Sequence, residues 1–152
     1  MILTVRAPLA GAVIGIEDVP DPVFAGRLVG PGLALEPERT GGRVTALAPV
    51  RGTLIKVHPH AFVVAGEGGR AVLVHLGLDT VSLAGAGFTV HASEGALVEA
   101  GDPVISFSPD RIEAEGLSPI TPVVALDAEE SDLFLAPPGT ALSPGMTAFT
   151  WA

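Results

Sequence analysis

The apolar residues of this chain occur in short runs, each closed by glycine or proline. Nineteen glycines and fourteen prolines separate these runs, and long segments with a 3.6-residue helical period are missing. The clearest runs are residues 52–57, 61–65, 71–76, 102–107 and 120–126. Short strand-like runs spaced by turn residues are typical of an all-β sandwich or barrel. We therefore expect an antiparallel β-sandwich or barrel with few short helices.

Two segments favour short helices. Residues 108–116 offer Ser108 as an N-cap, Pro109 at the first helical position and Gly116 at the exit. The prolines within residues 19–26 favour a bend or a single helical turn there.

The chain contains an internal repeat. Residues 7–16 (APLAGAVIGI) match residues 48–57 (APVRGTLIKV) at an offset of 41, and residues 95–107 match residues 139–151 at an offset of 44. Two related halves would stack into a pseudo-symmetric sandwich. The repeat also indicates that residues 7–16 form a strand, since they are too short for a membrane span and lack the flanks of a signal peptide.

Length and charge narrow the class of protein. We expect residues 1–152 to form one domain, which at this length buries roughly 68–70% of its unfolded surface without crosslinks. The net charge is −9 with a single lysine, so nucleic-acid binding is excluded, and the acidic surface fits either a basic partner or ordinary solubility. The chain has no cysteine, which excludes disulfides and thiolate metal sites and fits a cytoplasmic location.

Two histidines lie fifteen positions apart, each within an apolar run that is typical of a strand. His60 belongs to residues 58–64, His75 belongs to residues 71–80, and the turn-forming cluster GEGGR (66–70) separates the two runs. Pairing as a hairpin would bring both imidazoles onto neighbouring strands. Two imidazoles directed at one point suit either a metal ion or a phosphoryl group, and the spacing alone leaves both open.

The alternation of side chains along a strand refines this expectation. It predicts that His58 and His60 point to the same face of the first strand, and that Leu73 and His75 share a face of the second. Pro59 removes a backbone donor, which predicts an edge or a bulge at this strand end. A lone histidine in such a run is usually a packing residue, whereas two on adjacent strands favour a functional pair.

The segment around the histidines resembles a known family. Residues 61–88 (AFVVAGEGGRAVLVHLGLDTVSLAGAGF) are similar to the active-site stretch of the glucose-type enzyme IIA of the bacterial phosphoenolpyruvate-dependent sugar phosphotransferase system. The resemblance extends from about Leu3 to Trp151, with further similar segments at residues 7–26, 29–37, 48–54 and 118–126. It implies an antiparallel β-sandwich with a duplicated hybrid motif, in agreement with the repeat.

The resemblance also implies roles for individual residues. His75 matches the histidine that carries the phosphoryl group on Nε2, and His60 matches the histidine that hydrogen-bonds and stabilises that group. Asp79 matches an aspartate beside the site. His58 stands where the family often has a threonine that orients an imidazole, so we expect it to support the site by orienting a ring or adding positive charge.

The implied function is that of a phosphotransferase component with a phosphohistidine intermediate. His75 would accept a phosphoryl group from the histidine phosphocarrier protein and pass it to a cysteine of the IIB domain of a sugar permease. Asp21, Val23 and Phe24 match a segment that rims the site and meets protein partners. No nucleic acid partner and no membrane insertion are expected.

No cofactor is expected to be required, since transfer between two imidazoles needs positioning and charge compensation rather than a metal ion. The resemblance does imply that His60 and His75 can hold Zn²⁺ when a partner protein supplies a carboxylate.

Three other interpretations compete with this one. The first is a zinc hydrolase on a small β-barrel, with ligands His58, His60, His75 and Asp79. The second is a biotinyl or lipoyl carrier domain, which Lys56 does not suit because it lies within a strand-like run. The third is a regulatory protein that has lost phosphotransfer. The sequence does not name the sugar.

Overall fold

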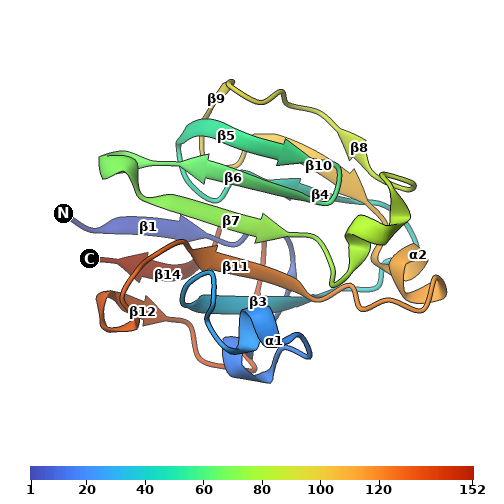
Figure 1. Ribbon diagram of the computed structural model, residues 1–152, viewed down its shortest axis with the longest axis horizontal. Helices are drawn as coiled ribbons and strands as arrows, with labels where there is room; N and C mark the ends of the chain where they lie inside the picture. Colours follow the sequence, from blue (N-terminus) through green and yellow to red (C-terminus); the bar gives the residue numbers. More distant parts are fainter.

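The computed structural model describes residues 1–152 and consists almost entirely of β-strands (Figure 1). The strands are β1 (Leu3–Arg6), β2 (Gly11–Gly15), β3 (Gly32–Pro37), β4 (Val44–Leu47), β5 (Gly52–His58), β6 (Ala61–Ala65), β7 (Ala71–His75), β8 (Thr89–Val90), β9 (Leu97–Val98), β10 (Pro103–Phe107), β11 (Thr121–Ala125), β12 (Leu133–Leu135), β13 (Ala141–Leu142) and β14 (Thr147–Trp151). The α-helices are α1 (Pro22–Ala25) and α2 (Pro109–Ala114), and the 3-10 helices are η1 (Ile16–Asp18), η2 (Glu67–Gly69), η3 (Thr80–Leu83) and η4 (Glu130–Asp132).

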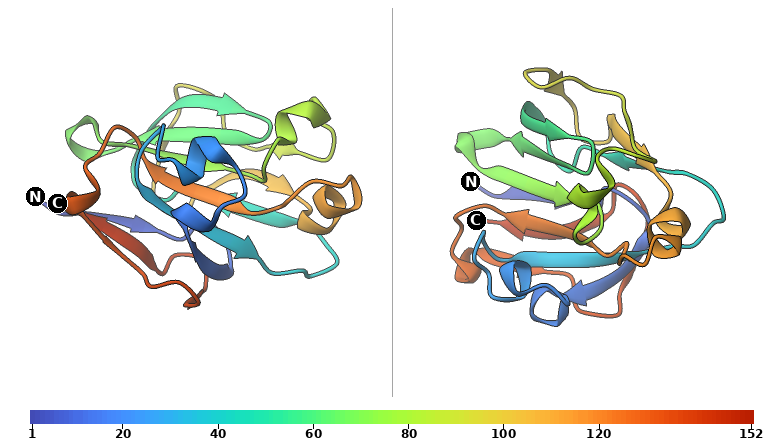
Figure 2. Two further views of the ribbon diagram at one scale, coloured as in Figure 1. Left: turned by 60° about the horizontal axis from the view of Figure 1, so that its bottom comes forward. Right: turned by 45° about the vertical axis from the view of Figure 1, so that its right-hand side comes forward.

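The strands form three antiparallel sheets. The large sheet has the order β13-β2-β3-β11-β7-β6-β5-β9, and the smaller sheets have the orders β1-β14-β12 and β4-β10-β8. The small sheets cover one face of the large sheet, and both chain termini lie at one end of the molecule (Figures 1 and 2). The expected all-β antiparallel architecture with two short helices is confirmed.

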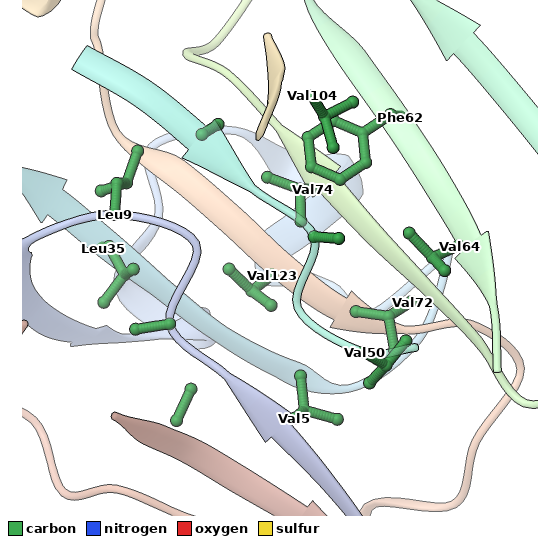
Figure 3. Close-up of a cluster of buried hydrophobic side chains, with 14 of the residues drawn as sticks. Val5, Leu9, Leu35, Val50, Phe62, Val64, Val72, Val74, Val104 and Val123 are labelled. Carbon is green, nitrogen blue, oxygen red and sulfur yellow. The ribbon is translucent and has the colours of Figure 1, made fainter. Parts of the chain in front are cut away.

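The main core lies between the large sheet and the two small sheets. It is a cluster of 26 buried residues, to which the large sheet contributes alternate side chains such as Phe62, Val64, Val72, Val74 and Val123 (Figure 3). Because alternate residues of a strand point to opposite faces, the residues between them face outward. This alternation places His75 on the outer face of the large sheet.

A second, smaller core lies on that outer face. Its six members are Ile16, Val19, Phe24, Ala34, Leu78 and Val124. They attach η1 and α1 to the outside of β3 and β11, which Figure 2 shows in its left view. The strands β3 and β11 are therefore covered on both faces, whereas β5 keeps exposed residues, among them Lys56 and His58.

Equivalent hydrogen bonds in the two halves confirm the repeat. Gly145 donates its N–H to the carbonyl of Ala7 (3.0 Å), and Gly101 donates in the same way to Ala48 (2.9 Å). A second equivalent set links Gly139 to Val13 (2.8 Å) and Gly95 to Leu54 (2.7 Å). Residues that match at the offsets of 41 and 44 in the sequence therefore make matching contacts.

Glycine is required at one matching position in each half. Gly11 and Gly52 begin the equivalent strands β2 and β5. A Cβ atom at Gly11 would overlap the carbonyl oxygen of Glu36, and a Cβ at Gly52 would overlap that of Ala65. The repeat thus preserves a close approach of two backbones, which only glycine permits.

Both short helices begin with a side-chain cap, which was predicted from the sequence for α2 and not for α1. The Ser108 side chain accepts a hydrogen bond from the Arg111 N–H (3.2 Å) at the start of α2, and Asp21 Oδ1 accepts one from Val23 N–H (2.9 Å) at the start of α1. A proline occupies the first turn of each helix. No helix combines the length and the apolar character that crossing a membrane requires.

Candidate functional site

The predicted hairpin is present as β6 and β7. Ala61 lies opposite His75, and the pairing continues to Ala65 opposite Ala71. The turn between the strands is closed by a hydrogen bond from the Gly66 N–H to the Arg70 carbonyl (2.9 Å). His75 is the last residue of its strand, so the site lies at the end of the hairpin away from this turn.

His60 is not part of a strand, in contrast to the alternation predicted for residues 58–64. The strand β5 ends at His58, and β6 begins at Ala61, so Pro59 and His60 form the turn that joins them. Proline favours such a reversal because its ring sets φ and removes the N–H donor. The structure therefore has a turn at Pro59, and the bulge of β5 lies earlier, between Leu54 and Lys56.

The rings of the two histidines nevertheless lie together, as expected. The ring of His58 stacks on that of His60, with 5.8 Å between centroids and 22° between planes. The ring of His60 then meets that of His75 at 5.2 Å and 73°. The three imidazoles form a row in which His60 is central.

The strand register explains this row. His58 lies opposite Ala61, and Ala61 lies opposite His75, so these three residues occupy one level across β5, β6 and β7. Directly opposed residues point to the same face of a sheet. The small side chain of Ala61 leaves a space between the two flanking histidines, and the ring of His60 reaches toward it from the turn.

The row of imidazoles borders a hollow on the outer face of the sheet. Its volume is about 250 Å³, and its lining is formed by Lys56, His58, His60, Ala61, Phe62, Val63, Leu73 and His75. A larger hollow of about 610 Å³ lies near Glu67, at the opposite end of the β6–β7 hairpin, and no histidine lines it. We assign the site to the smaller hollow because the titratable rings converge there.

One nitrogen of His75 is already engaged. Its Nδ1 lies 2.6 Å from the carbonyl oxygen of Gly77. A carbonyl only accepts hydrogen bonds, so Nδ1 carries the hydrogen and donates it. In the neutral ring Nε2 then keeps a free electron pair, which makes it the nucleophilic atom.

Burial favours the neutral form of the His60 and His75 rings. It lowers the pKa of His75 below the ordinary value, and the Gly77 carbonyl, Asp21 and Asp79 only partly oppose this effect. The pKa of His60 is lowered first by burial and then by repulsion from His75 and His58. A neutral imidazole has one N–H and one free nitrogen. The pair can therefore combine a nucleophile with a hydrogen-bond donor.

The predicted rim residues lie beside His75. Phe24 meets its ring edge-on at 5.2 Å, and Asp21 caps the helix that carries Phe24. Val23, in the same helix, is 42% exposed. Asp79 lies four residues after His75. Its side chain is exposed, and its backbone is left-handed with φ of 58°. Each site residue predicted from the sequence thus lies in or around this face.

Sequence reasoning missed three residues of the site. Ala61 separates the flanking histidines, Lys56 lines the hollow, and Gly77 supplies the carbonyl that holds Nδ1. Gly77 was the one of the three that the sequence offered, since it lies only two residues after His75. The roles of Ala61 and Lys56 depend on strand register, which the sequence does not state.

The zinc-hydrolase alternative is not supported. The structure contains no group of three or more histidine, cysteine, aspartate or glutamate side chains arranged to hold a metal ion. The predicted ligands His58, His60, His75 and Asp79 therefore do not assemble as a coordination sphere. The conditional site of His60, His75 and a partner carboxylate stays a prediction, since the partner would complete it.

The fold and sequence match known proteins. A sequence model of the phosphoenolpyruvate-dependent sugar phosphotransferase system, EIIA 1, matches residues 3–131. The chain is 42% identical over 146 residues to the glucose-specific EIIA component of Bacillus cereus, which covers 95% of this chain and 86% of that one. It is 42% identical over 129 residues to a glucose-specific EIIBCA component of Corynebacterium glutamicum, covering 85% of this chain and 19% of that one. The solved glucose permease IIA of Mycoplasma capricolum superposes with a TM-score of 0.89 at 30% identity, over 99% of this chain and 96% of that one.

Proposed function

The chain belongs to the EIIA 1 family of the phosphoenolpyruvate-dependent sugar phosphotransferase system, and from this premise we propose that His75 is the residue that carries the phosphoryl group. The observation that supports this assignment most directly is the hydrogen bond between Nδ1 of His75 and the Gly77 carbonyl (2.6 Å). It leaves Nε2 as the free nitrogen, beside the single N–H that the neutral ring of His60 can offer.

The proposed reaction is a direct transfer between imidazoles. Nε2 of His75 attacks the phosphorus of a phosphohistidine on the donor. The bond from phosphorus to the donor nitrogen breaks as the bond to Nε2 forms, and the donor ring takes back its electron pair. Donor and acceptor are the same kind of group, so the transfer is nearly balanced and reversible, and no cofactor is needed.

The neighbouring groups stabilise charge in this reaction. As Nε2 acquires phosphorus, positive charge develops on the ring of His75, and the Gly77 carbonyl that accepts from Nδ1–H stabilises it. An N–H of His60 donates to a phosphoryl oxygen. The apolar ring of Phe24 against His75 excludes water from one side of the transferred group.

The donor in this proposal is the histidine phosphocarrier protein, and the acceptor is a cysteine of a IIB domain. Relatives named EIIBCA, in which the part similar to this chain is a small share of the whole, support a IIB partner. Asp21 and Asp79 could pair with basic side chains of a partner, and Val23 offers an exposed apolar contact. A cytoplasmic location follows from these partners.

The sugar is proposed to be selected elsewhere. The chain is 42% identical to a component named as glucose-specific, 43% identical to one named as mannose-specific and 38% identical to one named as β-glucoside-specific. Similar EIIA portions thus occur with different sugars. We assign to this chain the phosphoryl relay that is common to all of them.

The test is to incubate the protein with phosphoenolpyruvate, enzyme I and the phosphocarrier and to measure acid-labile phosphate. The unaltered protein is expected to take up one phosphoryl group, and His75→Ala is expected to take up none. His91→Ala is a matched control, because His91 is exposed and its ring contacts Ser106 rather than the hollow. Normal labelling of the His75→Ala variant would exclude the proposal.

A further inference from the structure

We propose that His58 is a positioning residue, whose ring holds the ring of His60 against His75 by stacking. The inference rests on the proposed phosphotransfer function. In this proposal a contact between two rings, rather than a hydrogen bond, orients His60.

The first argument is that no hydrogen bond holds the ring of His60. No hydrogen bond in the structure reaches either of its ring nitrogens, and its backbone lies in the two-residue turn beside Pro59. A half-exposed side chain on a turn is free to change rotamer unless its neighbours restrict it. The contacts that restrict it are the stacked ring of His58 and the edge contact with His75.

The second argument is that His58 is itself well placed to restrict motion. It is the last residue of β5 and is paired with Ala61, so its Cβ direction is set by the sheet rather than by the turn. Its ring makes no hydrogen bond, and its plane is inclined by only 22° to that of His60. His58 is held by strand pairing and therefore restricts the motion of the His60 ring that stacks on it.

The third argument is that the register of β5, β6 and β7 leaves space for the ring of His60. Ala61 lies between His58 and His75 on the same level, and strands are spaced at about 4.7–4.9 Å. The flanking histidines are therefore separated by about two strand spacings. A single ring fits between them, and the ring of His60 reaches into that interval from the turn.

Stacking and charge make different demands on position 58. If a positive charge from His58 were the important property, a phenyl ring could not replace it. If the flat ring is what matters, His58→Phe will preserve the function and His58→Ala will lose it. The two properties are thus separable with one pair of variants.

The experiment measures transfer from the phosphorylated protein to the IIB domain for the unaltered protein, His58→Ala and His58→Phe. We expect His58→Ala to slow transfer by roughly ten- to a hundredfold, as small misplacements of catalytic groups do. His58→Phe should stay within about threefold of the unaltered protein by the same argument. His91→Ala is the control, since His91 is exposed and its ring contacts Ser106 rather than the hollow.

Two additional measurements make the result specific. In a His60→Gln background, His58→Ala should cause no further loss, because a residue that acts only through His60 has nothing left to orient. The ring at position 58 should contribute a ring-current shift to the His60 protons in the unphosphorylated unaltered protein and in His58→Phe, and this contribution should be lost in His58→Ala, where only that of His75 remains. This spectroscopic readout does not depend on phosphotransfer.

Equal transfer by His58→Ala and the unaltered protein would overturn the proposal, as would a His58→Phe variant as slow as His58→Ala. Additive losses in the His60→Gln background would also overturn it. A failure of the proposed function looks different: the unaltered protein would take no phosphoryl group at all, while the ring-current shifts would still respond to position 58.

Discussion

Phe24 meets the ring of His75 edge-on, with 5.2 Å between the ring centroids and 60° between the ring planes. Phe24 is only 6% exposed and belongs to the small core that attaches α1 to the outer face of the sheet. The same aromatic ring thus packs against the proposed nucleophile and secures the segment that is expected to meet the partners.

Replacement of Phe24 should separate these two tasks. Phe24→Ala is expected to lower the free energy of unfolding by about 3–5 kcal/mol, since it removes a large buried side chain. Phe24→Leu keeps most of the apolar volume and should cost less, but it loses the ring that flanks His75. We expect Phe24→Leu to slow phosphoryl transfer to His75 while the KM for the phosphocarrier stays near the parental value, both measured beside urea unfolding. A Phe24→Leu variant that accepts the phosphoryl group at the parental rate would show that the aromatic contact has no part in the transfer step.

His60→Gln should still accept a phosphoryl group but pass it on poorly. The amide of glutamine retains a donor, but it does not reproduce the position of the imidazole N–H. Loss of one such donor typically costs about 10²- to 10³-fold in rate. Each half-reaction is measured separately by rapid quenching, with His91→Ala as the control. Onward transfer from the His60→Gln protein at the parental rate would contradict the assigned role.

The ring of His75 should titrate below the ordinary histidine value of about 6.5. Burial lowers its pKa, whereas the Gly77 carbonyl, Asp21 and Asp79 act in the opposite direction. An NMR titration of the ring carbons should therefore give a midpoint below that of His75 in the unfolded chain. Asp21→Asn, which preserves a cap on α1, removes a negative charge and should lower the midpoint further. A midpoint that rises in Asp21→Asn would be inconsistent with this electrostatic account.

The same pKa shifts should make the folded state less stable in mild acid. The pKa values of His60 and His75 are lowered on folding, so the unfolded chain binds these protons at a higher pH than the folded chain does. The free energy of unfolding should therefore decrease as the pH falls from about 6.5 through the lowered folded values, and these two groups should contribute no dependence well above that window. Urea unfolding at several pH values measures this slope. His75→Gln should reduce the slope, and an unchanged slope would assign the effect to other groups.

The glycines that match in the repeat should both resist substitution. Gly11→Ala and Gly52→Ala each place a Cβ on a carbonyl oxygen of the neighbouring strand, which should cost at least about 1–3 kcal/mol of stability. Gly42→Ala is the matched control, because its Cβ would meet only the Thr40 hydroxyl at 4.0 Å. The control should be neutral or slightly stabilising, since alanine restricts the unfolded chain. Equal tolerance at all three positions would argue against a required close approach.

Local chemistry made much of this structure predictable. The strands β5, β6, β7, β10 and β11 follow the short apolar runs closed by turn residues. The start of α2 follows from a capping side chain with a proline at the first turn, and the prolines of residues 19–26 predicted the single turn of α1. These signals are local, because each involves a side chain and a backbone within a few residues of one another.

The prediction of strand alternation failed at His60 for a reason that is also physical. Alternation holds only while the backbone stays extended, and Pro59 lies where β5 reverses into β6. In a continuous strand His60 and Phe62 would point to the same face. Because a turn intervenes, Phe62 lies in the main core, whereas the ring of His60 lies with the other imidazoles on the outer face. The pattern of apolar residues alone does not distinguish these two cases.

The sequence by itself determined the class of fold, the repeat and the identity of the two histidines, because turn residues, hydrophobic spacing and recurring motifs are properties of the chain order. Only the tertiary structure decided that Ala61 separates His58 from His75 and that the Gly77 carbonyl holds Nδ1 of His75. Both facts depend on strand register and on the path of a turn. In these hairpins the register follows from the turns together with the packing of the sheet against its core, and the pattern of apolar residues alone does not give it.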